Sequence, residues 1–102
     1  MELELKNKIA LVTGSSKGIG KEIANTLLNE GCKVILNGRD KKSLEKTSKS
    51  FNPPTKFIIA DVTKPFECKK LIEKTIQLYG SLDIVVCNVG DGKSVAPGKE
   101  TI

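Results

Sequence analysis

The sequence contains no histidine, and its three cysteines lie far apart. Cys32, Cys68 and Cys87 are odd in number and have no histidine to join them as ligands. Zinc sites and disulfide frameworks need cysteines or histidines in characteristic, paired spacings. We therefore expect neither a metal site nor a disulfide framework, and we expect the cysteines to be reduced and partly buried.

Long hydrophobic runs are also missing. The longest apolar stretches have only about five residues, too few for a membrane span. The first eight residues, MELELKNK, carry charges where a signal peptide has a hydrophobic region. The sequence thus predicts neither export nor a membrane span, and the expected location is the cytoplasm.

Aromatic residues are few and the positive charge is dispersed. The chain has one Tyr, three Phe and no Trp, and its formal net charge of +5 comes from lysines scattered among glutamates. Nucleic-acid-binding proteins concentrate basic residues in patches and often add aromatic residues for base stacking. We therefore expect no nucleic-acid partner. The modest positive field favours a small phosphorylated ligand.

Four short runs rich in Val and Ile are spaced along the 102 residues, a length that suits one domain. They cover residues 9–13, 33–37, 56–60 and 83–87. Short apolar runs without alternation are typical of strands that are covered on both faces. Segments with helical periodicity separate them, so the order predicts an α/β fold with a parallel sheet and right-handed crossovers.

The helical segments have recognisable ends. The first has an apolar residue at every fourth position over residues 19–27, and Gly31 follows as a C-terminal cap. The third carries an apolar stripe, with Thr63 able to cap its start and Gly80 to end it. The middle segment, 40–50, has few large apolar residues, so we expect a short and more exposed helix there.

The stretch LVTGSSKGIGKEIA joins the first apolar run to the first helical segment. A helix that follows a parallel strand presents unpaired N–H groups and the positive end of its dipole, which together bind phosphate. Without Cβ atoms, Gly14, Gly18 and Gly20 allow a tight turn, close approach of a pyrophosphate and close packing of the helix. Ser15 and Ser16 can add hydroxyl donors. The alternative is a turn that binds no ligand.

The spacing Thr-Gly-x-x-x-Gly-x-Gly over residues 13–20 resembles the nucleotide-binding turn of the short-chain dehydrogenase/reductase family. The resemblance covers nearly the whole chain. It implies a partial Rossmann-like fold, a doubly wound parallel sheet with strand order 3-2-1-4. It also implies that residues 1–102 are a single N-terminal dinucleotide-binding portion, without the catalytic half.

Two further segments match the family in the expected order. ADV at residues 60–62 is similar to an Asp-Val pair that contacts the adenine end of the cofactor, although an Asp here can also bind backbone N–H groups before a helix. DIVVCNVG at residues 83–90 is similar to the family's strand ending in Asn-Asn-Ala-Gly. Asn88 and Gly90 match this ending, whereas Cys87 and Val89 depart from it and weaken the hydrogen bonding usual at this strand end.

The resemblance also bears on which nucleotide binds. Family members that prefer NAD place a carboxylate at the end of the second strand, where this chain has LNGRD. Arg39 can pair with a 2′-phosphate, and Lys17 matches a second basic position of NADP-preferring members, so NADP(H) is favoured over NAD. Asp40 is the alternative, because its carboxylate would face the ribose if the strand ended later. The implied cofactor-binding residues are Gly14, Ser15, Ser16, Lys17, Gly18, Ile19, Gly20, Arg39, Asp61, Val62, Asn88 and Gly90.

The family's catalytic residues have no counterpart in the chain. Members use a serine and a Tyr-x-x-x-Lys pair, in which the lysine lowers the phenol pKa. The single tyrosine, Tyr79, has Asp83 four residues later, so we interpret it as packing at a helix end. We expect no catalytic residue, and we expect the chain alone to be inactive and to bind nucleotide weakly or not at all.

The resemblance implies a parent oxidoreductase that transfers hydride between a nicotinamide cofactor and a carbonyl or alcohol substrate. We expect the chain to be a truncated part of that enzyme, and the parent to be a homo-oligomer. A noncatalytic nucleotide-binding or scaffolding module is the main alternative, because a fold does not fix a function. A relative of sugar-nucleotide epimerases is a weaker one, because their TGxxGxxG spacing does not fit residues 13–20.

Overall fold

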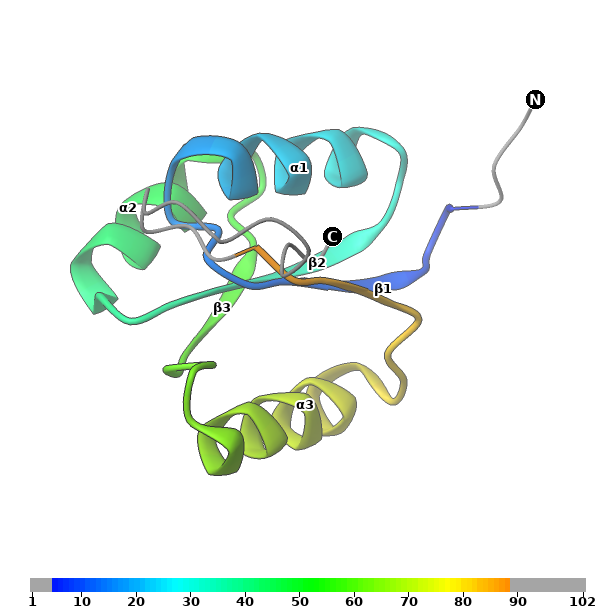
Figure 1. The fold of residues 1–102 in the computed structure, drawn as a ribbon. Coiled ribbons are helices and arrows are strands. Elements are labelled where there is room, and N and C mark those ends of the chain that lie inside the picture. Colours follow the sequence, from blue (N-terminus) through cyan, green and yellow to red (C-terminus); the bar gives the residue numbers. More distant parts are fainter. Residues whose placement is uncertain (1–4, 89–102) are drawn as a thin grey trace, which may run out of the picture.

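The computed structural model describes residues 5–88 as a four-stranded sheet with helices on both sides (Figure 1). The strands and helices alternate along the chain, as the sequence predicts. Their bounds are β1 (Ile9–Val12), α1 (Gly18–Asn29), β2 (Lys33–Gly38), α2 (Lys41–Ser50), β3 (Lys56–Ile59), α3 (Pro65–Tyr79) and β4 (Ile84–Val86).

The strands pair in the order β3-β2-β1-β4, and every pair is parallel. This confirms the predicted α/β Rossmann-like sheet with order 3-2-1-4. β4 (Ile84–Val86) is shorter than the predicted run by Asp83 and Cys87, and Asp83, just before it, bonds to the start of β1. The Asp83 carboxylate accepts a hydrogen bond from Ile9 N at 2.9 Å, and Asp83 N donates to Ile9 O at 2.9 Å.

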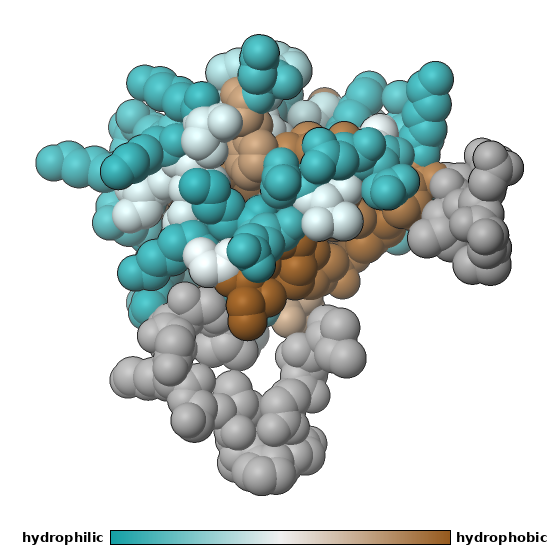
Figure 2. Space-filling model, turned by 90° about the horizontal axis from the view of Figure 1, so that it is seen from above, coloured by the Kyte–Doolittle hydropathy of each residue, from teal (hydrophilic) through white to brown (hydrophobic). Residues whose placement is uncertain are grey.

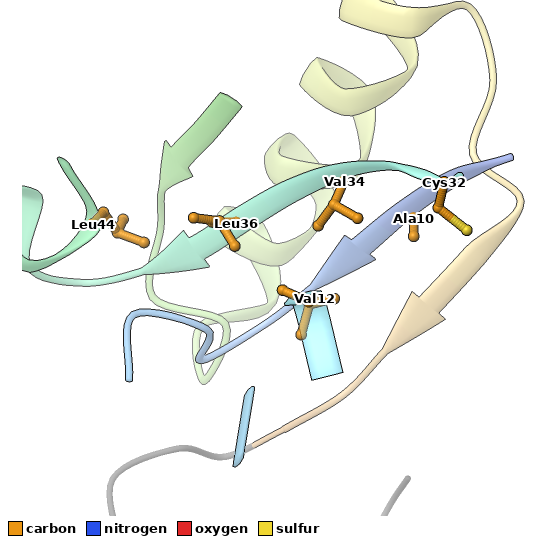
Figure 3. Close-up of a cluster of buried hydrophobic side chains, with 7 residues drawn as sticks. Ala10, Val12, Cys32, Val34, Leu36 and Leu44 are labelled. Carbon is orange, nitrogen blue, oxygen red and sulfur yellow. The ribbon is translucent and has the colours of Figure 1, made fainter. Parts of the chain in front are cut away.

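Both faces of the central strands are buried, which explains why their runs lack polar alternation. α1 and α2 cover one face and α3 covers the other (Figure 1). On the α1 and α2 face, Leu44 packs with alternate residues of β1 and β2 (Figure 3). On the α3 face, Leu11 and Ile35 pack with Leu71. The period-2 geometry of the strands therefore divides a continuous apolar run between two cores.

The helix ends agree with the glycine signals but not with the predicted cap of α3. Gly31 and Gly80 follow α1 and α3 with φ of 92° and 83°, values that favour glycine. The prediction that Thr63 caps α3 is wrong. Lys64 occupies the N-cap position without a side-chain cap, and Thr63 instead donates its hydroxyl to the Asp61 carboxylate at 2.6 Å.

The cysteines are free thiols in different surroundings. Cys32 is buried, and burial raises the pKa of its thiol. Cys68 is half-buried, as expected, but Cys87 is exposed because it follows β4 at the edge of the described sheet. Within residues 5–88, no group of three or more Cys, Asp or Glu side chains could hold a metal ion.

The surface above α1 is mostly hydrophilic, with an apolar strip across it (Figure 2). The scattered lysines contribute to this hydrophilic surface, as expected from their spacing among glutamates. No helix in the described part of the chain is long and apolar enough to cross a membrane.

Candidate functional site

A cavity of about 600 Å³ lies at the carboxyl end of the sheet. Open α/β sheets bind their ligands at this edge, where the loops that follow the strands come together. The cavity brings together the glycine turn after β1, the segment after β2 and the segment after β3. Of the predicted site residues it contains Gly14, Ser16, Lys17, Arg39, Asp61, Val62 and Asn88.

The glycine turn has the geometry that its spacing predicts. Gly14 and Gly18 have φ of 58° and 64°, in the left-handed region. A Cβ on Gly18 would meet no atom within 4 Å, so the backbone there is open to a ligand. A Cβ on Gly20 would lie 2.2 Å from Gly14 O, so this glycine serves the packing of α1 against the turn.

The first turn of α1 has no side chain that competes with an anion. Lys17 is the N-cap residue and makes no side-chain cap, and the first turn contains no acidic residue. The unpaired N–H groups and the helix dipole therefore remain available for a phosphate. Ile19, also in the predicted set, is 70% exposed and is not part of the cavity lining.

Ser15 acts inside the protein and not as the hydroxyl donor that we expected for a ligand. It is fully buried, and Oγ donates to Val12 O at 2.8 Å and accepts from Asn37 N at 2.9 Å. A hydroxyl has one proton to donate, so Ser15 has none left for a phosphate. Ser16, in contrast, lines the cavity, and its backbone carbonyl accepts a hydrogen bond from the Thr47 hydroxyl.

Asn88 fastens the glycine turn to the end of β4. Its Nδ2 donates to Gly14 O at 3.0 Å, and its backbone N donates to the Thr13 hydroxyl oxygen at 2.8 Å. The same hydroxyl donates to Asn88 O at 3.1 Å. Asn88 therefore binds the turn through both its side chain and its backbone. Gly90 lies outside the described residues.

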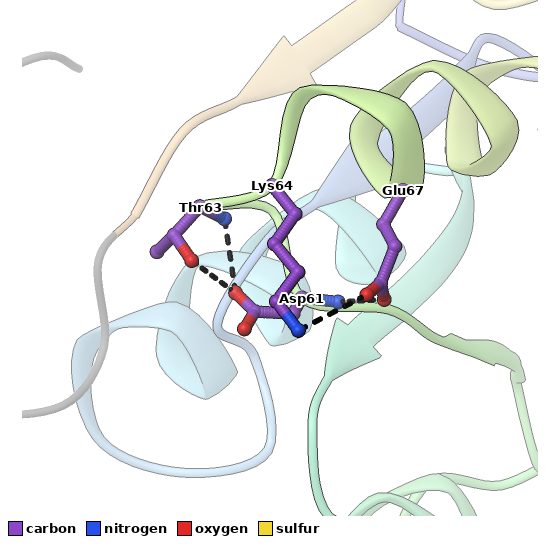
Figure 4. A network of polar contacts seen from close by, with 4 residues as sticks. All are labelled: Asp61, Thr63, Lys64 and Glu67. Atoms are coloured by element: carbon purple, nitrogen blue, oxygen red, sulfur yellow. Dashed lines mark hydrogen bonds and ion pairs between the residues drawn. The ribbon is translucent and has the colours of Figure 1, made fainter.

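Asp61 belongs to a polar network at the end of β3 (Figure 4). Its carboxylate accepts from Thr63 N at 3.0 Å and from the Thr63 hydroxyl, as the alternative interpretation of this Asp predicts. The Thr63 hydroxyl, followed by its backbone N–H and by smaller effects that include the Arg39 charge, lowers the pKa of the Asp61 carboxyl. Asp61 N donates to Glu67 Oε1 at 2.8 Å. Asp61 is thus ionised and fixed in position.

Asp40 lines the cavity, but its carboxylate is occupied by α2. One oxygen accepts from Lys42 N at 3.0 Å and the other from the Ser43 hydroxyl at 3.0 Å. The Ser43 hydroxyl, and then the Lys42 backbone, lower the pKa of the Asp40 carboxyl below its ordinary value of 3.8. Asp40 is therefore the N-cap of α2, which counts against a role as the ribose carboxylate.

Replacing Asp40 with alanine is expected to lower the Tm at pH 7 by about 5 °C, because α2 loses its cap. The variant Asp40→Asn keeps an acceptor oxygen and is expected to retain most of this stability.

Because the pKa of Asp40 is lowered in the folded state, its charge stabilises the protein above the unfolded-state pKa. That contribution disappears as the pH falls through the folded-state pKa. Circular dichroism melts between pH 7 and pH 2 should show the difference between the original chain and Asp40→Asn closing as the pH falls below 3.8. A difference that does not change with pH would contradict this role.

Two cations of the cavity form no ion pair in the described structure, although the Arg39 charge acts on the Asp61 carboxyl. Lys17 and Arg39 both line the cavity, and both are exposed. The ion pairs within residues 5–88 join Lys41 to Glu45 and Lys64 to Glu67. The cations of Lys17, in the glycine turn, and Arg39, after β2, are therefore available to an anionic ligand.

A glycine turn before a helix, at the carboxyl edge of a parallel α/β sheet, defines a dinucleotide-binding fold of the Rossmann type. The family described as short chain dehydrogenase matches residues 8–101. The chain belongs to this family.

Curated proteins with similar sequences include several oxidoreductases. An uncharacterized oxidoreductase of Staphylococcus saprophyticus is 42% identical over 92 residues, which cover 86% of this chain and 39% of that protein. A dehydrogenase/reductase SDR family protein 7-like of Dictyostelium discoideum is 36% identical over 102 residues, which cover 92% of this chain and 32% of that protein. The chain thus spans less than half of the length of these relatives.

Solved structures share the fold. The RhlG/NADP active-site complex of Pseudomonas aeruginosa has a TM-score of 0.75 and 35% identity, and the match covers 82% of this chain and 35% of that one. A short chain dehydrogenase of Shigella flexneri complexed with NADP has a TM-score of 0.74 and 33% identity, over 86% of this chain and 40% of that one. NADP is bound in these two structures.

Part of the cavity lining lies outside the set of residues predicted from the sequence. The sequence prediction treats Asn37 and Gly38 only as positions without the carboxylate that NAD-preferring members carry, and not as binding residues. Asn37 carries a signal that could have found it, since it is a polar residue at the end of a buried apolar run. The remaining lining residues beyond the predicted set are Asp40, considered from the sequence only as an alternative, and Ser43, Ala60 and Thr63.

Proposed function

We propose that the chain is the NADP(H)-binding portion of an oxidoreductase that transfers hydride between a nicotinamide cofactor and a carbonyl or alcohol substrate. The observation that carries this proposal is the cavity, whose lining includes the glycine turn and the cations of Lys17 and Arg39. Membership of the short chain dehydrogenase family supports the reaction class. The two similar structures that contain NADP support the choice of nucleotide.

Each wall of the cavity suits one part of the nucleotide. The N-terminus of α1 and the open backbone at Gly18 would hold the pyrophosphate. Arg39 and Lys17 would bind the 2′-phosphate, which NAD lacks. Asp61 and Val62, at the end of β3, would lie against the adenine end. A bound nicotinamide would donate or accept the hydride, and the described residues would act by binding and orienting the nucleotide.

Direct binding tests the nucleotide part of the proposal. We expect 2′,5′-ADP, which carries the 2′-phosphate, to bind the chain with a dissociation constant in the millimolar range and about tenfold more tightly than 5′-ADP. Titration of 15N-labelled chain should move the backbone NMR signals of Gly18, Arg39 and Asp61. The absence of shifts at about 10 mM of either nucleotide, in the chain and in the full-length parent alike, would overturn the proposal.

The activity of the whole protein needs residues that the chain does not contain. Reading the coding sequence past Ile102 should reveal a downstream serine and a Tyr-x-x-x-Lys motif. A stop codon at that point, together with a soluble and folded chain, would favour a noncatalytic nucleotide-binding module instead.

A further inference from the structure

Asn37 lies at the junction of the three segments that form the cavity. It is 1% exposed, and it is a polar residue in the buried part of β2, where burial without hydrogen bonds would be costly. Its side chain and its backbone bind two different segments. It also lines the cavity itself.

The side-chain amide of Asn37 binds the end of β3. Nδ2 donates to Ile58 O at 3.1 Å and to Ala60 O at 3.2 Å, so both of its protons are used. Ala60 lies one residue beyond β3 and immediately before Asp61. The ladder hydrogen bond from Ala60 N to Gly38 O, at 3.1 Å, is the last that joins the two strands, so Asn37 extends their connection toward the cavity.

The backbone of Asn37 binds the glycine turn. Asn37 N donates to Ser15 Oγ at 2.9 Å, and Asn37 O accepts from Ser15 N at 2.9 Å. Ser15 Oγ in turn donates to Val12 O, at the end of β1. The turn after β1 is therefore held against β2 through atoms that a substitution of the Asn37 side chain would leave in place.

We propose that Asn37 is a positioning residue that sets the distance between the phosphate-binding turn and the adenosine-binding end of β3. This proposal rests on the proposed function. The two donors of the amide fix the wall that carries Asp61 and Val62, whereas the Ser15 contacts fix the wall that carries Gly14 and Ser16. A neutral amide does this without placing a carboxylate beside a nucleotide phosphate.

The two attachments predict different effects on two ligands. In Asn37→Leu, the β3 wall loses its amide donors while the glycine turn keeps its backbone contacts. We expect about tenfold weaker binding of 2′,5′-ADP and less than a twofold change for inorganic pyrophosphate, which occupies the turn alone. In Ser15→Ala, which loosens the turn, we expect both ligands to bind more weakly.

NMR titration of the 15N-labelled chain measures both affinities, and circular dichroism reports whether each variant folds. Asn25→Leu is the matched control, because Asn25 is exposed on α1 and does not line the cavity. If Asn37→Leu does not fold, Asn37→Ser takes its place, since it keeps one donor and is expected to lose affinity for 2′,5′-ADP selectively.

The outcomes separate this inference from the proposed function. If neither the unaltered chain nor the full-length parent binds 2′,5′-ADP, the proposed function fails. If that chain binds and the Asn37 variant binds equally well, or loses both ligands in the same proportion, the positioning role is overturned.

Discussion

Replacing Gly20 with alanine is expected to lower the free energy of unfolding by about 3 kcal/mol or more. The added Cβ would lie 2.2 Å from Gly14 O, 2.9 Å from Gly14 C and 2.7 Å from Asn88 Nδ2. Two of these atoms belong to the backbone of the turn, so no rotation of a flexible side chain relieves the overlap. α1 would have to move away from β1, which would also break the contact of Asn88 with the turn.

Gly18→Ala is the matched control for this experiment. Its Cβ would meet no neighbour within 4 Å, but its φ of 64° makes a side chain unfavourable, at a cost of about 1–2 kcal/mol. Urea unfolding followed by circular dichroism gives the stability of both variants. Equal losses for the two would contradict the close-packing role assigned to Gly20.

Charge reversal at Arg39 is expected to have the largest effect on ligand choice. In Arg39→Asp, a cation that lines the cavity becomes an anion, so attraction for a 2′-phosphate turns into repulsion. We expect the preference for 2′,5′-ADP over 5′-ADP to fall by about 100-fold and to reverse. Arg39→Lys keeps the charge but loses the planar guanidinium. Its preference for 2′,5′-ADP should therefore lie between that of the unaltered chain and that of Arg39→Asp.

Lys46→Asp is the control for net charge. Lys46 is exposed on α2 and does not line the cavity. Its replacement by Asp changes the net charge of the chain by the same amount as Arg39→Asp does. Paired titrations with the two nucleotides, at one fixed salt concentration, give the ratio of affinities for each variant. An unchanged ratio in Arg39→Asp, or an equal change in Lys46→Asp, would count against Arg39 as the residue that selects NADP.

The fold was predictable because its signals are local. Successive residues such as Ile35 and Leu36 point to opposite covered faces, so an unbroken apolar run marks a central parallel strand. Gly31 and Gly80 mark helix ends because few other residues adopt their φ values. The strand order came from the family resemblance and not from the runs themselves.

The details that escaped prediction depend on partners distant in the sequence, or on a choice between close neighbours. Ser15 has the hydroxyl that a ligand donor needs, but this hydroxyl is bound by Asn37, which is 22 residues away. Thr63 was available as a helix cap, but Asp61, two residues earlier, takes its hydroxyl proton. Sequence pattern shows which groups can form hydrogen bonds, whereas the tertiary fold selects their partners.

The hydrogen bond from Asn88 to Gly14 joins residues that are 74 positions apart. During synthesis, β1, β2 and β3 can leave the ribosome and pair before the residue that holds the glycine turn has been translated. Contacts over such a separation form late, since a long loop must close first. The glycine turn therefore takes its final shape only after β4 has been synthesised and has joined the sheet.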